Sequence, residues 1–291
     1  MIYGIKRTTK YLLGIDIAGR SLAVYPDDTF IVSYPRSGNT WTRFLVANLL
    51  YPRETVSFAN IERLIPDAEA VSSRYLKRIQ RPRIIKSHEY FDHRYPKVLY
   101  IVRDPRDVLV SYYHFSRKFR HIADDFPLEK YVHLIVTGTL EATNWGTWAE
   151  NVGTWLAARS GRSTFLLLRY EDMLSDAHTE LAKLADFFGV GASPEQLQRA
   201  IDNSSADRLR ELEKKESSEW VATRNRRSDI PMIGSAVPGK WKSVLPASAV
   251  EEIESAWGSI MVQLGYELVT QKAANVQPPL AATAGFGKQH E

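Results

Sequence analysis

The sequence predicts an α/β fold with a central parallel sheet flanked by helices. Short apolar runs, typical of buried parallel strands, alternate with longer segments whose apolar residues recur at helical spacing. No segment repeats at a fixed period, so repeat architectures are not indicated. The chain has 291 residues, 44% of them hydrophobic and 25% charged, which is the composition of a globular protein with a sizeable core.

We expect a single domain over residues 29–270. Residues 1–28 form a lead-in, and residues 271–291 lack an apolar face and are expected to be a disordered tail. The N-terminal apolar run is too short for a signal peptide, and nowhere do eighteen apolar residues follow one another. The chain has no cysteine, which fits a reducing compartment. We therefore expect a cytoplasmic protein with no transmembrane segment.

The first predicted unit is a strand that ends near residue 33, a turn, and a helix that continues to residue 50. Backbone N–H groups at a helix start point outward together and carry partial positive charge, so the turn predicts an anion site. Four side chains add donors to it: Arg36, Ser37, Asn39 and Thr40. The Gly-Lys-Ser/Thr ending of ATP-binding P-loops is absent, and an ordinary strand-to-helix turn is the alternative interpretation.

The next strand is predicted at residues 83–86, after two short amphipathic helices within residues 53–80 that Pro66 separates. This strand places Ser87 and His88 at its carboxyl end, where ligands of open parallel sheets bind. Histidine suits proton transfer near neutral pH, although a single histidine is more often solvated or hydrogen-bonded. The histidines are not spaced from carboxylates as metal ligands are, so we predict no metal.

A third strand is predicted at residues 97–102. A helix follows, with Asp104 as N-cap, Pro105 at its first position and Asp107 in the place of a capping box. Arg103 and Ser111 can face one ligand phosphate, because an arginine offers a planar fork of donors. The alternative for Arg103 is an ion pair with one of the two nearby aspartates.

The rest of the chain predicts further helices around one more strand. We expect helix over residues 127–160, with an apolar stripe for core packing made by Trp145, Trp148 and Trp155. A strand over residues 163–170 ends in Tyr170. Helices follow near residues 176–188, 194–202 and 205–215, and a last helix spans the region from Pro246 to Gly265. The polar, arginine-rich residues 216–240 between them are expected to close over the site.

Several of these segments resemble the sulfotransferases that use 3′-phosphoadenosine 5′-phosphosulfate (PAPS). Residues 34–41, Tyr-Pro-Arg-Ser-Gly-Asn-Thr-Trp, resemble the family's 5′-phosphosulfate loop, and residues 103–113 resemble its 3′-phosphate motif. Residues 86–88, 146–155 and 170–173 match further family segments in the family's order. The resemblance covers about residues 29–265 and implies the P-loop-like sulfotransferase fold.

The resemblance also implies an activity. The chain is similar to cytosolic-type, bacterial-like small-molecule sulfotransferases, which move a sulfuryl group in line from PAPS to a hydroxyl or amine and release adenosine 3′,5′-bisphosphate (PAP). It implies that His88 is the general base and that Arg36 and Lys86 stabilise the transferred group. The implied nucleotide contacts are Arg36, Ser37, Gly38, Asn39, Thr40, Trp41, Arg103, Ser111 and Tyr170.

Three segments depart from the family pattern. Gly-Ser-Ala at residues 234–236 replaces an Arg-Lys-Gly that binds the 3′-phosphate in the family. Ser-Ser-Ala at residues 204–206 replaces a Thr-Ser-Phe that contacts the adenine. At the third position, Arg36 replaces a lysine. Two alternatives therefore stay open: a non-catalytic nucleotide-binding relative, and a P-loop phosphotransferase or kinase.

The sequence leaves the acceptor and the oligomeric state open. A small molecule such as a phenol or a steroid-like alcohol, a glycan or a lipid all fit. The net charge of +4 suits an anionic ligand, and no basic run with interleaved aromatics indicates nucleic acid.

Overall fold

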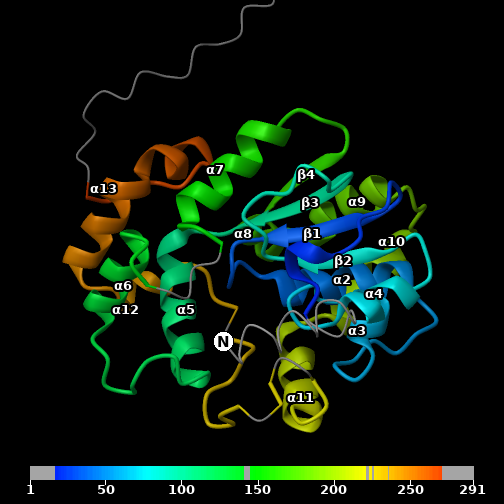
Figure 1. Ribbon diagram of the computed structural model, residues 1–291, viewed down its shortest axis with the longest axis horizontal. Helices are drawn as coiled ribbons and strands as arrows, with labels where there is room; N and C mark the ends of the chain where they lie inside the picture. The colour runs from blue at the N-terminus through cyan, green and yellow to red at the C-terminus, as the bar shows by residue number, and fades with distance from the viewer. Residues whose placement is uncertain (1–16, 141–144, 221–222, 225, 235, 271–291) are drawn as a thin grey trace, which may run out of the picture.

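The computed structural model describes residues 17–140, 145–220, 223–224, 226–234 and 236–270. Within them, four parallel strands form one sheet in the order β2-β1-β3-β4 (Figure 1). The strands are β1 Thr29–Ser33, β2 Ile84–Ser87, β3 Lys97–Val102 and β4 Phe165–Arg169. Helices flank this sheet, so the predicted α/β fold with a central parallel sheet is confirmed. Most of the predicted lead-in and the whole predicted tail lie outside the described residues.

The strand register brings the carboxyl ends of all four strands to one edge. Val32 of β1 lies opposite Ser87 of β2 and Tyr100 of β3, and Val102 of β3 lies opposite Arg169 of β4. The chain passes to one side of β1 to form β2 and to the other side to form β3. The loops after β1 and β3 therefore diverge, which leaves room for a ligand at this edge.

The sheet is buried on both faces because its strands are almost continuously apolar. Phe30 and Val32 pack into one hydrophobic cluster, while Ile31 between them packs into the other. The first cluster includes residues of α4 Ser73–Arg78, α5 Pro105–Lys118, α6 Leu128–Val136, α7 Trp148–Arg159, α12 Trp241–Val244 and α13 Ala247–Gln263. The second includes residues of α2 Asn39–Leu50, α3 Ile61–Leu64, α8 Tyr170–Ser175, α9 Ala177–Phe188, α10 Pro194–Asn203 and α11 Ala206–Glu216. The 3₁₀ helix η1 spans Gly19–Ser21.

The prediction of helix over residues 127–160 is wrong in its middle. Helix α6 ends at Val136, and Gly138 follows with a φ of 68°, a left-handed conformation that glycine adopts without strain. Helix α7 begins only after Thr147, whose side chain forms a reciprocal capping box with Glu150. The tryptophan stripe is broken accordingly, because Trp145 precedes α7 while Trp148 and Trp155 lie in the core. None of the described helices is both long and apolar enough to span a membrane.

Candidate active site

Each of the four strands delivers one candidate residue into the same cavity. Arg36 follows β1, His88 follows β2, Arg103 follows β3 and Tyr170 follows β4, and all four line a cavity of about 1030 Å³. The site is therefore built on loops that a rigid sheet positions. This is the arrangement expected at the carboxyl edge of a parallel sheet.

The loop between β1 and α2 packs closely against Tyr170. Gly38 has a φ of 100°, and a Cβ atom added there would lie 2.4 Å from the Cδ2 atom of Tyr170. The Asn39 amide nitrogen donates inward to the Ser33 hydroxyl oxygen at 3.1 Å, so this side chain braces the loop. Ser37 is fully buried, and its hydroxyl has no hydrogen-bond partner among the described residues.

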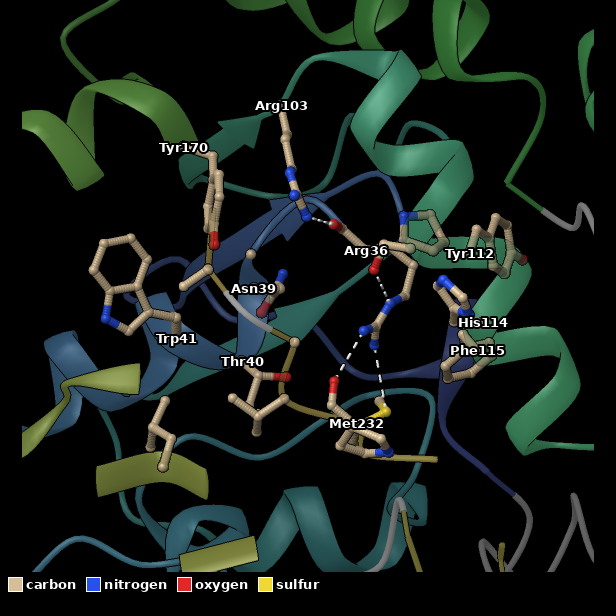
Figure 2. A pocket seen from close by; sticks show the side chains of 18 of the residues that line it. Arg36, Asn39, Thr40, Trp41, Arg103, Tyr112, His114, Phe115, Tyr170 and Met232 are labelled. Carbon is tan, nitrogen blue, oxygen red and sulfur yellow. Dashed lines mark hydrogen bonds between the residues drawn. The ribbon is translucent and has the colours of Figure 1, made fainter. Parts of the chain in front are cut away.

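Arg36 lies at the centre of the cavity. Its Nε donates to the Ser111 hydroxyl oxygen at 3.1 Å, and its Nη2 donates to the Met232 carbonyl oxygen at 3.0 Å. Figure 2 shows the guanidinium between the Arg103 side of the cavity and Met232, with Tyr112, His114 and Phe115 beside it. Burial, and next the charge of Arg103, lower the Arg36 pKa to about 10. Arg36 is therefore still a cation at neutral pH, and its φ of 70° is a strained conformation of the kind found at functional sites.

Arg103, Tyr170 and Trp41 form a second wall. The Arg103 guanidinium carbon lies 4.5 Å from the centre of the Tyr170 ring, and the Trp41 ring meets Tyr170 edge-on at 5.6 Å (Figure 2). Arg103 Nη1 also donates to the Arg36 carbonyl oxygen at 3.3 Å. A flat group can stack on these rings while an anion meets the guanidinium. Thr40 lines this wall, as do Gly38 and Asn39.

His88 is held in one tautomer. Its Nδ1 lies 2.7 Å from the Ser33 carbonyl oxygen, which can only accept, so Nδ1 carries the proton and Nε2 is left with a free lone pair. Burial, followed by the nearby charge of Lys86, lowers the His88 pKa to about 3. The imidazole is therefore neutral near pH 7, which is the form that can accept a proton.

Lys86 lines the cavity but is committed to two carboxylates. Its Nζ lies 2.8 Å from the Glu69 Oε2 atom and 3.1 Å from the Asp67 Oδ1 atom. Burial would lower the Lys86 pKa, but the charges of Asp67 and Glu69 outweigh it and raise that pKa. Lys86 is therefore positively charged, and the carboxylates of Asp67 and Glu69 balance that charge.

The sequence did not indicate several residues that belong to this site. Asp67 and Glu69 come from the loop before α4, and Trp145 meets the His88 ring edge-on at 5.8 Å, so it lines the cavity instead of the core. No pattern marked these residues, because they approach the cavity from irregular segments.

The capping-box role predicted for Asp107 is wrong. Asp104 does cap α5, accepting from the Arg106 amide, but the Asp107 carboxylate turns away and accepts from the backbone amides of Gly239 and Trp241 at 2.6 and 2.9 Å. Asp107 therefore ties the segment before α12 to the start of α5.

The comparisons with known proteins agree on one family. Residues 26–265 match the model of the sulfotransferase domain. A 3-beta-hydroxysteroid sulfotransferase of Cavia porcellus is 29% identical over 245 residues, which cover 80% of this chain and 83% of that protein. Sulfotransferase 2A6 of Mus musculus is 28% identical and covers 82% of this chain and 86% of its own length.

Solved structures share the fold. A retinol dehydratase in complex with androsterone and the inactive cofactor PAP has a TM-score of 0.68 at 20% identity, covering 93% of this chain and 88% of its own. The mouse sulfotransferase SULT7A1 complexed with PAP has a TM-score of 0.66 at 21% identity, covering 84% and 87%.

Proposed function

Since this chain belongs to the sulfotransferase family, we propose that it transfers a sulfuryl group from PAPS to a hydroxyl or amine of a small acceptor. One observation carries the proposal. Two cations, Arg36 and Arg103, meet a neutral imidazole in one cavity at the ends of neighbouring strands. Structures of similar fold that were solved with PAP support the choice of donor. Gly38, Asn39 and Thr40, at the start of α2, line the same cavity, which fits a loop that binds a phosphate at a helix N-terminus.

The donor supplies the activated sulfuryl group, and the residues of this chain supply position, charge and a base. In the proposed mechanism, His88 Nε2 accepts the proton of the acceptor while Ser33 keeps the proton on Nδ1. Arg36 and the amides at the start of α2 meet the negative charge that develops on the leaving phosphate, and such charge stabilisation is a large part of transfer catalysis. Lys86 also lines the cavity, but Asp67 and Glu69 balance its charge, so the larger part of the charge stabilisation is assigned to Arg36.

The acceptor proposed here is an apolar molecule that carries one hydroxyl or amine. Aromatic and aliphatic side chains line much of the cavity: Val110, Phe115, Phe119, Trp145, Ile230 and Met232. The apolar part of the acceptor can pack against these side chains, and its hydroxyl or amine can then bind to His88. The names of the relatives, with a hydroxysteroid and androsterone among them, support this choice.

The first test of the proposal is calorimetric binding of PAP, 5′-AMP and ATP without magnesium. We expect micromolar binding of PAP and weaker binding of the two nucleotides without a 3′-phosphate, because Arg103 and Ser111 are proposed to contact that phosphate. The activity test combines PAPS with androsterone or 2-naphthol as probe acceptors. PAP that binds no better than AMP, together with no transfer to either acceptor, would contradict the proposal.

Lys240 is the candidate that replaces the family's missing Arg-Lys-Gly. Of residues 234–236, Gly234 and Ala236 line the cavity without cationic side chains, and residue 235 lies outside the described residues. Lys240 also lines the cavity, and both its neighbours in sequence donate their amides to Asp107. The same carboxylate lies 3.9 Å from Arg103 Nη2 and one helical turn before Ser111. Asp107 thus anchors Lys240 beside the proposed 3′-phosphate contacts.

We expect Lys240→Ala to weaken PAP binding about tenfold, the size of one charge-assisted hydrogen bond, and to leave 5′-AMP binding unchanged. The matched control is Lys242→Ala, since Lys242 is only two residues further on, within α12, but is outside the cavity wall and lies over Trp241. Calorimetry with both ligands measures the difference. Equal weakening of PAP and AMP would remove Lys240 from the 3′-phosphate site.

A further inference from the structure

One carboxylate contacts all three residues of the segment that ends in His88. The Glu69 Oε1 atom accepts from the His88 backbone N–H at 2.7 Å and from the Ser87 hydroxyl at 3.2 Å. Its Oε2 atom accepts from the Lys86 ammonium at 2.8 Å. Every one of these partners is a donor, so Glu69 is the shared acceptor of the segment.

The backbone places Glu69 beside this segment. Ala68 donates its amide to the Lys86 carbonyl oxygen at 2.9 Å, and Lys86 donates its amide to the Pro66 carbonyl oxygen at 2.8 Å. Residues 66–69 therefore run along the end of β2 as a short parallel extension of the sheet. The side chain of Glu69 then has a defined position relative to the His88 backbone.

We propose that Glu69 is a positioning residue for His88, holding its backbone so that the imidazole can act on an acceptor. This inference rests on the proposed function, in which His88 is the base. The difference between the two anchors of His88 supports it. The ring bonds at Nδ1 to the neutral oxygens of Ser33, the carbonyl at 2.7 Å and the hydroxyl at 3.4 Å, while the backbone N–H bonds to a carboxylate. Charge-assisted hydrogen bonds are shorter and stronger than neutral ones, so loss of the carboxylate frees the segment.

Asp67 provides the matched comparison. It contacts the same Lys86 ammonium at 3.1 Å. It also contacts Glu69, by accepting from the Glu69 amide and by a hydrogen bond between the two carboxyl groups, but it makes no hydrogen bond to the His88 backbone N–H, which Glu69 occupies. Replacement of Asp67 by asparagine therefore weakens the Lys86 ion pair without touching the His88 backbone. Replacement of Glu69 by glutamine affects both, because its NH₂ group would face either Lys86 or the His88 N–H, and each of these is a donor.

The pH dependence gives a second, separate readout. Burial raises the pKa of Glu69, Lys86 opposes the shift and Asp67 adds to it, giving a value of about 7. The titratable groups that face Glu69 are Lys86 and His88 from the end of β2, Asp67 from its own loop, and Tyr95. With a pKa of about 3, His88 stays neutral when Glu69 takes up a proton. A protonated Glu69 has the shape of glutamine and one acceptor fewer.

The experiment compares Glu69→Gln and Asp67→Asn with the wild type, using PAPS and whichever of androsterone and 2-naphthol the wild type sulfates. We expect kcat of Glu69→Gln to fall about 10- to 100-fold, the effect of a small misplacement of a catalytic group, with a much smaller change in KM. Wild-type kcat should fall as pH is lowered through about 7, and the variant should be flat over that range at the low rate. PAP calorimetry on each variant checks that the fold is intact.

Three results would overturn the inference: wild-type kcat in Glu69→Gln, an equal loss in Asp67→Asn, or an acid limb near pH 7 that persists in Glu69→Gln. If Glu69→Gln fails to bind PAP, NMR of the wild-type His88 ring decides. The ring should respond near pH 7 while keeping the signature of a neutral imidazole, and no response there overturns the inference. A wild type with neither PAP binding nor transfer contradicts the proposed function itself.

Discussion

Replacement of His88 by alanine should lower kcat on the order of 100-fold or more while PAP binding stays near the wild-type value. The reason is local. The imidazole is neutral, its Nδ1 is occupied by the Ser33 carbonyl oxygen, and Nε2 is therefore the nitrogen with a lone pair for an acceptor proton. Single-turnover assays with PAPS and calorimetry with PAP measure the two quantities separately.

The control for this variant is His88→Asn. An asparagine side chain can still donate a hydrogen bond toward the Ser33 carbonyl oxygen, but it has no basic nitrogen. We expect it to be as slow as the alanine variant and at least as stable to heat. An asparagine variant with nearly wild-type kcat, or a parallel loss of PAP affinity in both variants, would remove His88 from the role of base.

Arg36→Ala should lose about 100- to 1000-fold in kcat, as is usual when one group that stabilises developing charge is removed. Burial makes the effect large, because the same charge acts more strongly where water is excluded. Arg36→Lys should recover much of this loss, since it keeps a cation at the same place but not the fork that reaches both Ser111 and Met232. Rapid-quench kinetics at saturating PAPS measure kcat directly.

A third variant separates the side chain from the backbone at this position. Arg36→Gly relieves the left-handed conformation, so its fold should be no less stable than that of the alanine variant. Both should be equally slow if the guanidinium is what matters. A glycine or alanine variant that turns over at the wild-type rate would contradict the role of Arg36.

The strand ends were predictable from the sequence because each is marked by a change of pattern. A buried apolar run stops, and a polar or turn-forming residue follows, as at residues 33–38 and at Arg103. Parallel strands share one carboxyl edge, so residues after different strands were expected to meet, and the cavity lining brings Arg36, His88 and Arg103 together. Local sequence and general sheet geometry sufficed for this part.

The contacts that Glu69 and Asp107 make around the cavity were not predictable, because they depend on how irregular segments pack. Glu69 contacts residues 17 to 19 positions away, and Asp107 contacts backbone amides more than 130 positions away. No periodicity relates such partners. The error over residues 127–160 has a similar cause, since a glycine and a capping threonine divided a segment that was apolar enough to be read as continuous helix.

The convergence of the four strand ends has a consequence for how such a site can change. The backbone of β1 pairs with β2 on one side and β3 on the other, and β3 also pairs with β4, so the strand pairing depends on backbone groups and not on the side chains that follow the strands. The side chains just beyond the strand ends take no part in strand pairing, although His88 and Asn39 bond to Ser33 at the end of β1. Mutation can therefore change a side chain in one of these loops, and with it a ligand preference, without breaking the pairing of the strands. The same sheet can then carry a different chemistry when the side chains of a single loop change.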